Sequence, residues 1–326
     1  MSEAKVIFST HVLHPEVTHS LRALGEYRVA SAPTPEAINA ESAGAEIIVV
    51  RAKIAPEIVI REKGLMACVR HGAGLDMIPV DVATKAGVLV ANVPGANAIT
   101  VAEHVIWSAL ALLRKYPAVN SDLRNEGWES GRKHSNDGRE LSGRTVGILG
   151  VGNIGRQIAS MSQHGFGCKV IAHTRTPANL SDGITQVPFD DLLAQSDVLV
   201  LSCPLTDETA GIIDQHAITK MKQGALLINV SRGPVTDEAA LIAALASEHL
   251  GGAAIDVFDE QPLPSDHAFF SLPNVILTPH MAGITEESML RMGQGVVAET
   301  KRILAGEKPD NFCNPQVWDD YRTRLT

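Results

Sequence analysis

The feature that most constrains this chain is a glycine motif that follows a short apolar run. Residues 146–149 are apolar and are predicted to form a buried parallel strand. They lead into Gly150, Gly152 and Gly155, spaced as G-x-G-x-x-G, and then into a helical pattern over residues 156–163. Gly150 would permit a tight turn, Gly152 would leave room for a pyrophosphate, and Gly155 would let the helix lie close to the strand. Glycines alone indicate only a turn, but a strand before them and a helix after them predict a dinucleotide-binding unit.

Composition limits the class of protein. The 326 residues are enough for about two domains. With 45% hydrophobic and 20% charged residues the chain is typical of a globular protein, and its net charge of -9 argues against a nucleic-acid-binding surface. The start of the sequence has no secretory pattern, and no apolar run is long enough to span a bilayer. Four scattered cysteines without a C-x-x-C pair fit reduced thiols, so we expect a cytoplasmic protein without a metal site or a membrane partner.

Strand and helix patterns alternate on both sides of the glycine motif, which predicts parallel sheets covered on both faces. Before the motif, strands are predicted at residues 5–8, 27–30, 46–50, 67–70 and 88–92, and helices at 15–24, 35–43, 56–63 and 80–86. After it, strands are predicted at 168–173, 197–202, 225–230, 252–255 and 275–277, and helices at 191–196, 215–221, 237–248 and 286–305.

These elements predict an α/β fold with two doubly wound parallel-sheet domains. A flavodoxin-like substrate domain would comprise residues 1–99 and 288–326, because the tail is expected to return to it, and a six-stranded Rossmann domain would comprise residues 100–287. A long helix over residues 100–116 would open the second domain, with Thr100 as its cap and Glu103 completing a capping box. The polar segment that follows, residues 120–143, carries no clear pattern.

Several strand ends carry side chains suited to hydride transfer. Arg232 could bind a carboxylate with two hydrogen bonds, His280 could exchange a proton near neutral pH, and Asp256 could hold the amide of a nicotinamide. Glycine-rich loops at residues 70–76 and 92–97 could direct backbone N–H groups into a crevice, although they could also be surface turns. Because parallel strands end at one sheet edge, the set suggests chemistry on a 2-oxoacid or 2-hydroxyacid.

The second strand after the motif indicates which cofactor binds. An acidic residue is expected near position 174, where it would accept from both ribose hydroxyls of NAD. Here Thr174 and Arg175 stand instead, and a guanidinium suits a 2′-phosphate. We therefore expect NADP to be preferred, with NAD as the alternative if the loop has merely lost its acid.

These stretches together resemble the D-isomer-specific 2-hydroxyacid dehydrogenase family, which includes D-3-phosphoglycerate dehydrogenase and hydroxypyruvate/glyoxylate reductase. The matching stretches are residues 70–76, 92–103, the glycine motif, 203–206, 229–233, 256–264 and 278–283. The resemblance implies that Arg232 holds the substrate carboxylate and keto oxygen, that His280 is the proton donor, and that the N–H groups of Ala73 and Gly74 bind the carboxylate. It also implies two domains that close, and a homodimer formed through the nucleotide domains. The chain looks too short for the regulatory domain of some relatives.

The cofactor contacts expected from the motif and from the resemblance form a larger set: Thr100, Gly150, Gly152, Asn153, Ile154, Gly155, Arg156, Thr174, Arg175, Cys203, Pro204, Val230, Asp256 and Gly283.

The sequence departs from the family in two places. The acid that binds the ribose is replaced by Thr174 and Arg175, a pair that resembles the NADP-using reductases. The second departure concerns catalysis. The family's catalytic glutamate, which partners the histidine, precedes a proline, and here Gln261 occupies that place. Asp259 could supply the missing charge if the loop is extended, because it would share a side with Gln261. We expect an NAD(P)-dependent oxidoreductase that interconverts a small 2-oxoacid and its D-2-hydroxyacid, with hydroxypyruvate or glyoxylate first. The alternatives are a D-3-phosphoglycerate dehydrogenase-like activity, for which no phosphate clamp is evident in the loops, and a catalytically weak nucleotide-sensing protein.

Overall fold

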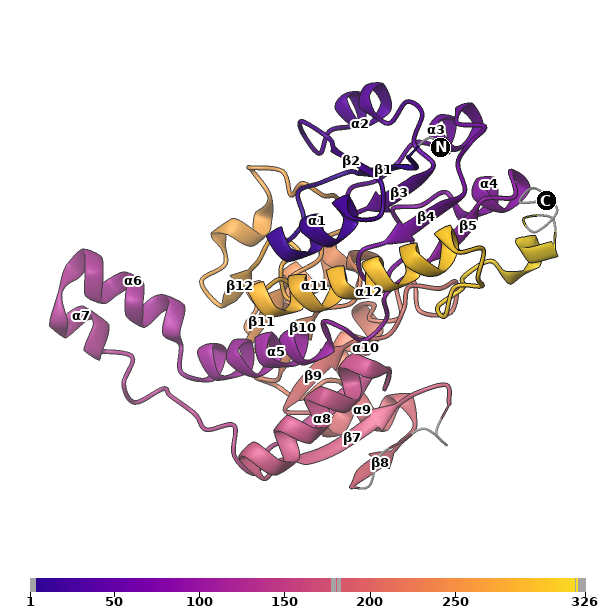
Figure 1. Ribbon diagram of the computed structural model, residues 1–326. Coiled ribbons are helices and arrows are strands. Elements are labelled where there is room, and N and C mark those ends of the chain that lie inside the picture. The colour runs from indigo at the N-terminus through magenta and orange to yellow at the C-terminus, as the bar shows by residue number, and fades with distance from the viewer. Residues whose placement is uncertain (1–3, 177–179, 181–182, 320, 322–326) are drawn as a thin grey trace. The chain divides into compact units, whose positions relative to one another are not determined.

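The computed structural model describes residues 4–176, 180, 183–319 and 321 (Figure 1). The chain forms two compact units, and each is described by itself. Unit 1 comprises Met1–Asn97 and Ile284–Thr326, and unit 2 comprises Ala98–Gly283. The chain therefore leaves unit 1 once and returns to it at its end.

Unit 1 is built on a five-stranded parallel sheet in the order β2-β1-β3-β4-β5. This 2-1-3-4-5 order is the flavodoxin-like arrangement that the sequence predicts. The strands are β1 (Val6–Ser9), β2 (Glu26–Val29), β3 (Ile47–Val50), β4 (Ala67–Arg70) and β5 (Leu89–Ala91). The helices are α1 (Pro15–Arg22), α2 (Pro35–Glu41), α3 (Pro56–Arg61), α4 (Val80–Lys85) and α12 (Glu286–Leu304).

Both faces of this sheet are covered, which explains why its strands are continuous apolar runs. Side chains of α1 and α12 pack on one face with Ile7, Val49 and Val69, and those of α2, α3 and α4 pack on the other. Proline begins α1, α2 and α3, where a missing N–H costs little. Thr285 and Ser288 form a reciprocal capping box at the start of α12.

The described part of the tail lies against β5. Phe312 forms an antiparallel bridge with Ala91, and the short helix η4 (Pro315–Val317) follows. The side chain of Asn314 is buried and bonds to three groups: its Oδ1 accepts from the Val90 N–H at 2.8 Å, and its Nδ2 donates to the Val88 carbonyl at 2.9 Å and to Thr84 Oγ1 at 3.1 Å. One polar side chain thus fastens the tail to the edge of the sheet.

Unit 2 is built on a seven-stranded parallel sheet in the order β12-β11-β10-β9-β6-β7-β8. Counted from β6, the order is 3-2-1-4-5-6 with a seventh strand, the arrangement of dinucleotide-binding folds. The strands are β6 (Thr145–Leu149), β7 (Lys169–His173), β8 (Ile184–Gln186), β9 (Val198–Leu201), β10 (Leu226–Asn229), β11 (Gly252–Ile255) and β12 (Val275–Leu277). The sequence predicts six of them and misses the edge strand β8.

The helices of unit 2 form two layers. On one face α5 (Ala98–Leu113) and α8 (Asn153–Phe166) pack against the sheet, and on the other face α9 (Phe189–Gln195), α10 (Gln215–Lys220) and α11 (Glu238–Ala246) do so. The loops after β10 and β11 carry the short helices η2 (Gly233–Val235) and η3 (Ala268–Ser271).

One expectation about this unit was wrong, and two of its helices were not predicted. Helix α5 begins at Ala98, so Thr100 lies within its first turn and is not its cap. Asn97 precedes it, and asparagine is as strong a cap residue as threonine. The segment after α5 contains two helices that the sequence does not predict, α6 (Tyr116–Glu126) and α7 (Trp128–Arg132), which extend away from the sheet of unit 2 as a helical pair (Figure 1). Within the described residues, no helix is long and apolar enough to cross a membrane.

Candidate active site

The glycine turn between β6 and α8 has the geometry that a dinucleotide requires. Gly150 has a φ of 90°, and a Cβ there would lie 2.6 Å from the Cα of Cys203. A Cβ at Gly155 would lie 2.5 Å from the carbonyl oxygen of Gly150, whereas one at Gly152 would meet open space. The fold thus requires glycine at positions 150 and 155, and Gly152 leaves open space beside the turn in which a pyrophosphate could lie.

The start of α8 offers unpaired backbone donors. Gly152 is the N-cap and supplies no side-chain hydrogen bond, and the N–H of Arg156 is the first to reach back to the Gly152 carbonyl at 3.1 Å. The N–H groups of Asn153, Ile154 and Gly155 therefore have no partner within the helix. With the positive end of the helix dipole behind them, these groups fit the pyrophosphate of a dinucleotide.

The end of β7 shows what would meet the adenine ribose. Thr174 and Arg175 follow His173, and no acidic side chain stands among the three. Gln186 donates to the Thr174 carbonyl at 3.3 Å, which ties this strand end to β8. Arg175 is exposed, so its guanidinium is open to an anion.

Asp256, which directly follows β11, is an anchor for the neighbouring strand end. It is 3% exposed, and its carboxylate accepts from Thr278 Oγ1 at 2.6 Å and from the N–H groups of Met281 and Ala282 at 2.8 and 3.0 Å. The side chain that we expected to hold a nicotinamide amide thus shapes the segment that carries His280. His104 on α5 lies next to Thr278, with its Nε2 3.5 Å from Thr278 Oγ1. Burial lowers the pKa of His104, and the negative charge of Asp256 partly opposes this shift.

His280 is held in an uncommon backbone conformation. Its φ is 53°, and its N–H donates to the carbonyls of Asp256 at 2.8 Å and Thr278 at 3.0 Å. A non-glycine residue in the left-handed region is uncommon, although histidine adopts it more readily than most. Such positions gather at functional sites, where the surrounding structure enforces them.

Gln261 occupies the place beside this histidine. Its Oε1 lies 3.1 Å from Nδ1 of His280, and its Nε2 donates to the Phe258 carbonyl at 3.3 Å. Because Nε2 of Gln261 is engaged by a carbonyl, its Oε1 is the atom that accepts from the ring. The neutral ring of His280 therefore carries its proton on Nδ1, which leaves Nε2 as the base.

Arg232 follows β10 in a turn fixed by a buried asparagine. Asn229 is fully buried; its Oδ1 accepts from the N–H and the hydroxyl of Ser231 at 3.0 Å each, and its Nδ2 donates to the Arg232 carbonyl at 3.0 Å. The guanidinium of Arg232 donates to the Ser231 carbonyl at 2.6 Å. Asn229 was not among the predicted site residues, although a polar residue at the end of the apolar strand β10 was an available signal.

The other expected cofactor residues of unit 2 lie at several of its strand ends and at the start of α5. Cys203 and Pro204 follow β9, Val230 follows β10, Gly283 lies beyond β12, and Thr100 is in the first turn of α5. Burial raises the pKa of Cys203 to about 11, so this thiol stays protonated at neutral pH. The fold thus brings the side chains that follow β6, β7, β9, β10, β11 and β12 to the carboxyl edge of one sheet.

In unit 1, the loop after β4 presents backbone donors. Arg70 shapes this loop by donating to the carbonyls of Gly74 at 2.9 Å, Val50 at 2.8 Å and His71 at 2.8 Å. Within the described part of the chain, the N–H groups of Ala73 and Gly74 have no hydrogen-bond partner. Such N–H groups can donate to a carboxylate, which is the role that the family resemblance implies for them.

Two further residues, His71 and Arg51, lie at this edge of the sheet, and the sequence did not predict the role of either. His71 is 3% exposed, and burial together with Arg51 and Arg70 lowers its pKa to about 3, so it is a neutral core histidine. Arg51 directly follows β3 and was missed; its position after an apolar strand was the available signal. Its Nη1 donates to the Val12 carbonyl at 2.6 Å, and burial lowers its pKa.

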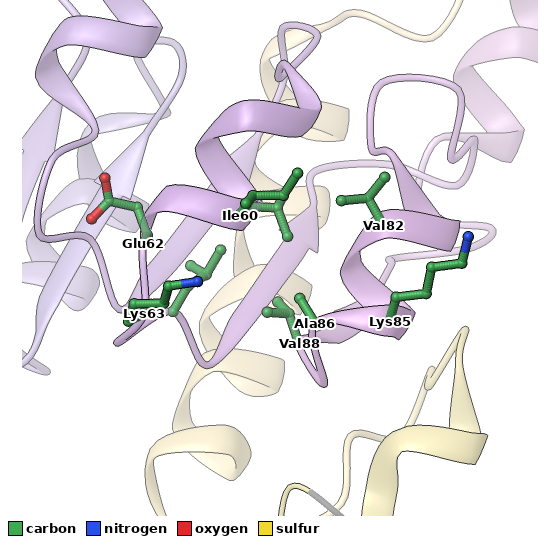
Figure 2. A pocket seen from close by; sticks show the side chains of 9 residues that line it. Ile60, Glu62, Lys63, Val82, Lys85, Ala86 and Val88 are labelled. Atoms are coloured by element: carbon green, nitrogen blue, oxygen red, sulfur yellow. The ribbon is translucent and has the colours of Figure 1, made fainter.

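A groove of about 560 Å³ lies elsewhere in unit 1, between α3 and α4 (Figure 2). Aliphatic side chains including Ile60, Val82 and Val88 line it, with Lys63 and Lys85 at its sides. It lies near the residues that precede β4 and β5, which is the amino edge of the sheet. Ligands of open α/β sheets bind at the carboxyl edge, so we do not assign the substrate to this groove. Among the described residues, no group of histidine, cysteine or acidic side chains is arranged to hold a metal ion.

The strand order of unit 2 and its glycine turn define a dinucleotide-binding fold, and comparison with known proteins identifies the family. The sequence model of the D-isomer specific 2-hydroxyacid dehydrogenase NAD-binding domain matches residues 106–282, more than half of the chain. The chain belongs to the D-isomer-specific 2-hydroxyacid dehydrogenase family.

Three relatives show the range of this similarity. The D-3-phosphoglycerate dehydrogenase of Mycobacterium tuberculosis is 36% identical over 307 residues, covering 93% of this chain and 57% of its own length. An NADPH-dependent glyoxylate/hydroxypyruvate reductase from Sinorhizobium meliloti, solved with NADP and malonate, is 28% identical with a TM-score of 0.82, covering 95% of this chain and 97% of that one. An NAD-dependent formate dehydrogenase from Staphylococcus aureus, solved with NAD, is 26% identical with a TM-score of 0.82. The match covers 94% of this chain and 98% of the formate dehydrogenase chain. The chain spans little more than half the length of the curated relatives it matches.

Proposed function

We propose that this protein is an NAD(P)-dependent oxidoreductase that interconverts a small 2-oxoacid and its D-2-hydroxyacid. The observation that carries the proposal is the arrangement of Arg232, Gln261 and His280 at the carboxyl edge of the sheet that bears the glycine turn. Membership of the 2-hydroxyacid dehydrogenase family supports it.

In this mechanism the residues divide between substrate binding and proton transfer. Arg232 binds the substrate carboxylate and keto oxygen, and the N–H groups of Ala73 and Gly74 bind the carboxylate. A bound nicotinamide would supply or accept the hydride. During reduction His280 gives the proton on its Nε2 to the keto oxygen, and during oxidation the neutral Nε2 takes the hydroxyl proton. Gln261 keeps the ring oriented throughout by accepting from Nδ1.

The substrate we place first is hydroxypyruvate or glyoxylate, on which the Sinorhizobium meliloti relative is named as acting. A second candidate is D-3-phosphoglycerate and its 2-oxoacid. It is favoured by Arg51, a partly buried guanidinium at the same strand edge as the Ala73–Gly74 loop, and by the names of the curated relatives. A guanidinium there could bind a phosphate that glyoxylate lacks.

We further propose that NADP is the preferred cofactor, because Thr174 and Arg175 stand where an acid would repel its 2′-phosphate. NAD is the alternative, because the solved structures similar to this chain include one named as NAD-dependent and one named as NADPH-dependent. We also propose a cytoplasmic homodimer. The four cysteines are free, and α6 and α7 expose apolar side chains on unit 2.

The experiment is a panel of 2-oxoacids, including glyoxylate, hydroxypyruvate and 3-phosphohydroxypyruvate, with the loss of NADPH or NADH absorbance as the measurement. We expect turnover of at least one, a loss of kcat on the order of 10²–10⁴-fold in His280→Ala, and poor activity in Arg232→Lys, because an ammonium cannot form a bidentate pair. Near-normal turnover by either variant, or no oxidation of either cofactor across the panel, would contradict the proposal.

A further inference from the structure

A second set of charged side chains gathers near the candidate site and has no part in the mechanism above. Nε2 of His267 lies 2.8 Å from Oε1 of Glu238, and the side chains of these two residues are only 17% and 21% exposed. Glu238 opens α11, and His267 precedes η3 on the loop that follows β11. The pair therefore links the segment after β10 to the segment after β11.

The protonation of His267 follows from its second ring nitrogen. Nδ1 accepts from the backbone N–H of Phe269 at 3.3 Å, so it carries no proton. Nε2 must then hold the proton of the neutral ring, and its N–H donates a hydrogen bond to the Glu238 carboxylate. Asp237 and Asp259 are the other charged groups of this cluster, and burial, followed by the charges of Glu238 and Asp237, raises the pKa of Asp259.

Aromatic packing continues this link toward Gln261. The ring of His267 packs against Phe269 at 4.9 Å between centroids, and Phe269 packs against Phe258 at 6.3 Å. Both phenylalanines are buried. Phe258 is also the residue whose carbonyl accepts from Gln261 Nε2 at 3.3 Å and so directs Gln261 Oε1 toward His280.

The same two segments meet at a second point. A Cβ at Gly233 would overlap the backbone carbon and oxygen of Phe258 and the nitrogen of Asp259. Backbone therefore packs directly on backbone beside Arg232, and only glycine fits there. The segment that carries Arg232 and the loop that carries Gln261 are thus joined at two points. At one, the backbone of Gly233 packs on the backbone of Phe258, and at the other, the side chain of Glu238 pairs with that of His267.

We propose that the Glu238–His267 pair is a positioning device that holds the loop of residues 258–267 so that Gln261 stays on Nδ1 of His280. The inference rests on the proposed role of His280 as the proton donor. Neither Glu238 nor His267 is assigned a contact with substrate or cofactor; each acts through Phe269 and Phe258 on Gln261.

The kinetic test is a double-mutant cycle between Glu238 and Gln261. Glu238→Ala should lower kcat for the best 2-oxoacid on the order of tenfold, because small displacements of catalytic groups are costly, while KM for the cofactor stays near its parent value. In a Gln261→Ala background the same substitution should change kcat little, because no contact remains to be positioned. A merely structural role would give the same loss in both backgrounds. Glu238→Gln, which keeps an acceptor and the side-chain shape, should fall between parent and Glu238→Ala and also serves if the alanine variant folds poorly.

A matched control is Asp190→Asn, which breaks the 2.7 Å pair between Lys220 and Asp190 on the surface of the same unit. It should leave kcat unchanged. Equal losses in Asp190→Asn and Glu238→Ala, or additive losses in the cycle, would overturn the proposal.

A readout without turnover separates this proposal from the proposed function. In protein labelled with ¹⁵N-histidine, the signals of His280 can be assigned by their loss in His280→Gln. We expect the neutral ring in the parent to be protonated on Nδ1, and Glu238→Ala to give a mixture of tautomers. This result without turnover of any 2-oxoacid would refute the proposed function and leave the positioning role standing. A parent-like tautomer in folded Glu238→Ala would refute the positioning role.

Discussion

At the scale of single residues, the exchange of a carboxylate for an amide at position 261 has the clearest consequence. Gln261 accepts from His280 Nδ1 as a carboxylate would, so it orients the ring, but it brings no negative charge to stabilise the imidazolium. The amide therefore separates two functions that a glutamate combines.

The first prediction follows from that separation. In Gln261→Glu the new carboxylate should raise the pKa of His280, so the falling limb of kcat/KM for 2-oxoacid reduction should move to higher pH. Asp259→Asn should leave the limb in place, because Asp259 interacts with Asp237, Glu238 and His267, while Gln261 faces the ring. The measurement is the pH profile of the parent and both variants. A limb that moves down in Asp259→Asn would instead mean that Asp259 supplies the charge.

The second prediction concerns Arg175. A charge-assisted contact with a 2′-phosphate is worth about 1.5–3 kcal/mol, or one to two decades of affinity. Arg175→Ala should therefore raise KM for NADPH and leave KM for NADH nearly unchanged. Steady-state kinetics with both cofactors decides the matter, and equal losses would show that Arg175 serves the fold or the shared pyrophosphate site.

At the scale of elements, the sequence predicted the strands and helices whose buried residues form an apolar pattern. The strands β4, β11 and β12 were placed to the residue. β4 and β11 are buried along most or all of their length, and β12 is a short apolar run with a buried centre. Edge strand β8 was missed because its three residues are not buried. Helices α6 and α7 were missed for a similar reason: no residue of α6 is buried, so no apolar stripe marks it.

In the candidate site, single residues were predictable from the sequence, but the pairs that they form were not. Gly150, Arg232 and His280 are found from local patterns, since each follows a predicted strand. The pairs that organise them are not local: Gln261 and His280 are 19 residues apart, and Glu238 and His267 are 29 apart. Periodicity carries no information about such pairs, and the first was expected only from the family resemblance.

The third prediction tests an element that the sequence did not resolve, the tail against β5. Asn314→Ala would leave the buried Val90 N–H and Val88 carbonyl without their partner, and each such group costs about 1–3 kcal/mol. We expect a clear fall in the urea midpoint of unfolding. Asn125→Ala on α6, which removes only an exposed 3.3 Å contact with Ser121, is the matched control and should change stability by less than about 0.5 kcal/mol. Equal effects of the two substitutions would contradict the fastening role.

At the scale of the whole molecule, α6 and α7 are the feature that a single copy of the chain does not explain. Tyr116, Leu123 and Trp128 on these helices are 54%, 44% and 66% exposed. Apolar side chains gathered on one element are typical of a protein interface, and aromatic residues are enriched at such interfaces. The proposed homodimer would cover them, which is why we place its interface on this part of unit 2.

The fourth prediction is that Trp128→Glu dissociates the dimer, because a carboxylate would be buried without a partner in the interface. Light scattering coupled to gel filtration, at several protein concentrations, should show a dimer for the parent and a monomer for the variant. The control is Ile60→Glu, which places the same charge on an aliphatic residue that is 55% exposed in unit 1, and which should remain a dimer. A parent that stays monomeric at micromolar concentration would refute the homodimer. A Trp128→Glu protein that stays dimeric would place the interface elsewhere. If the dimer forms as proposed, α6 and α7 should also gain protection from hydrogen exchange as the concentration rises, while α3 should not.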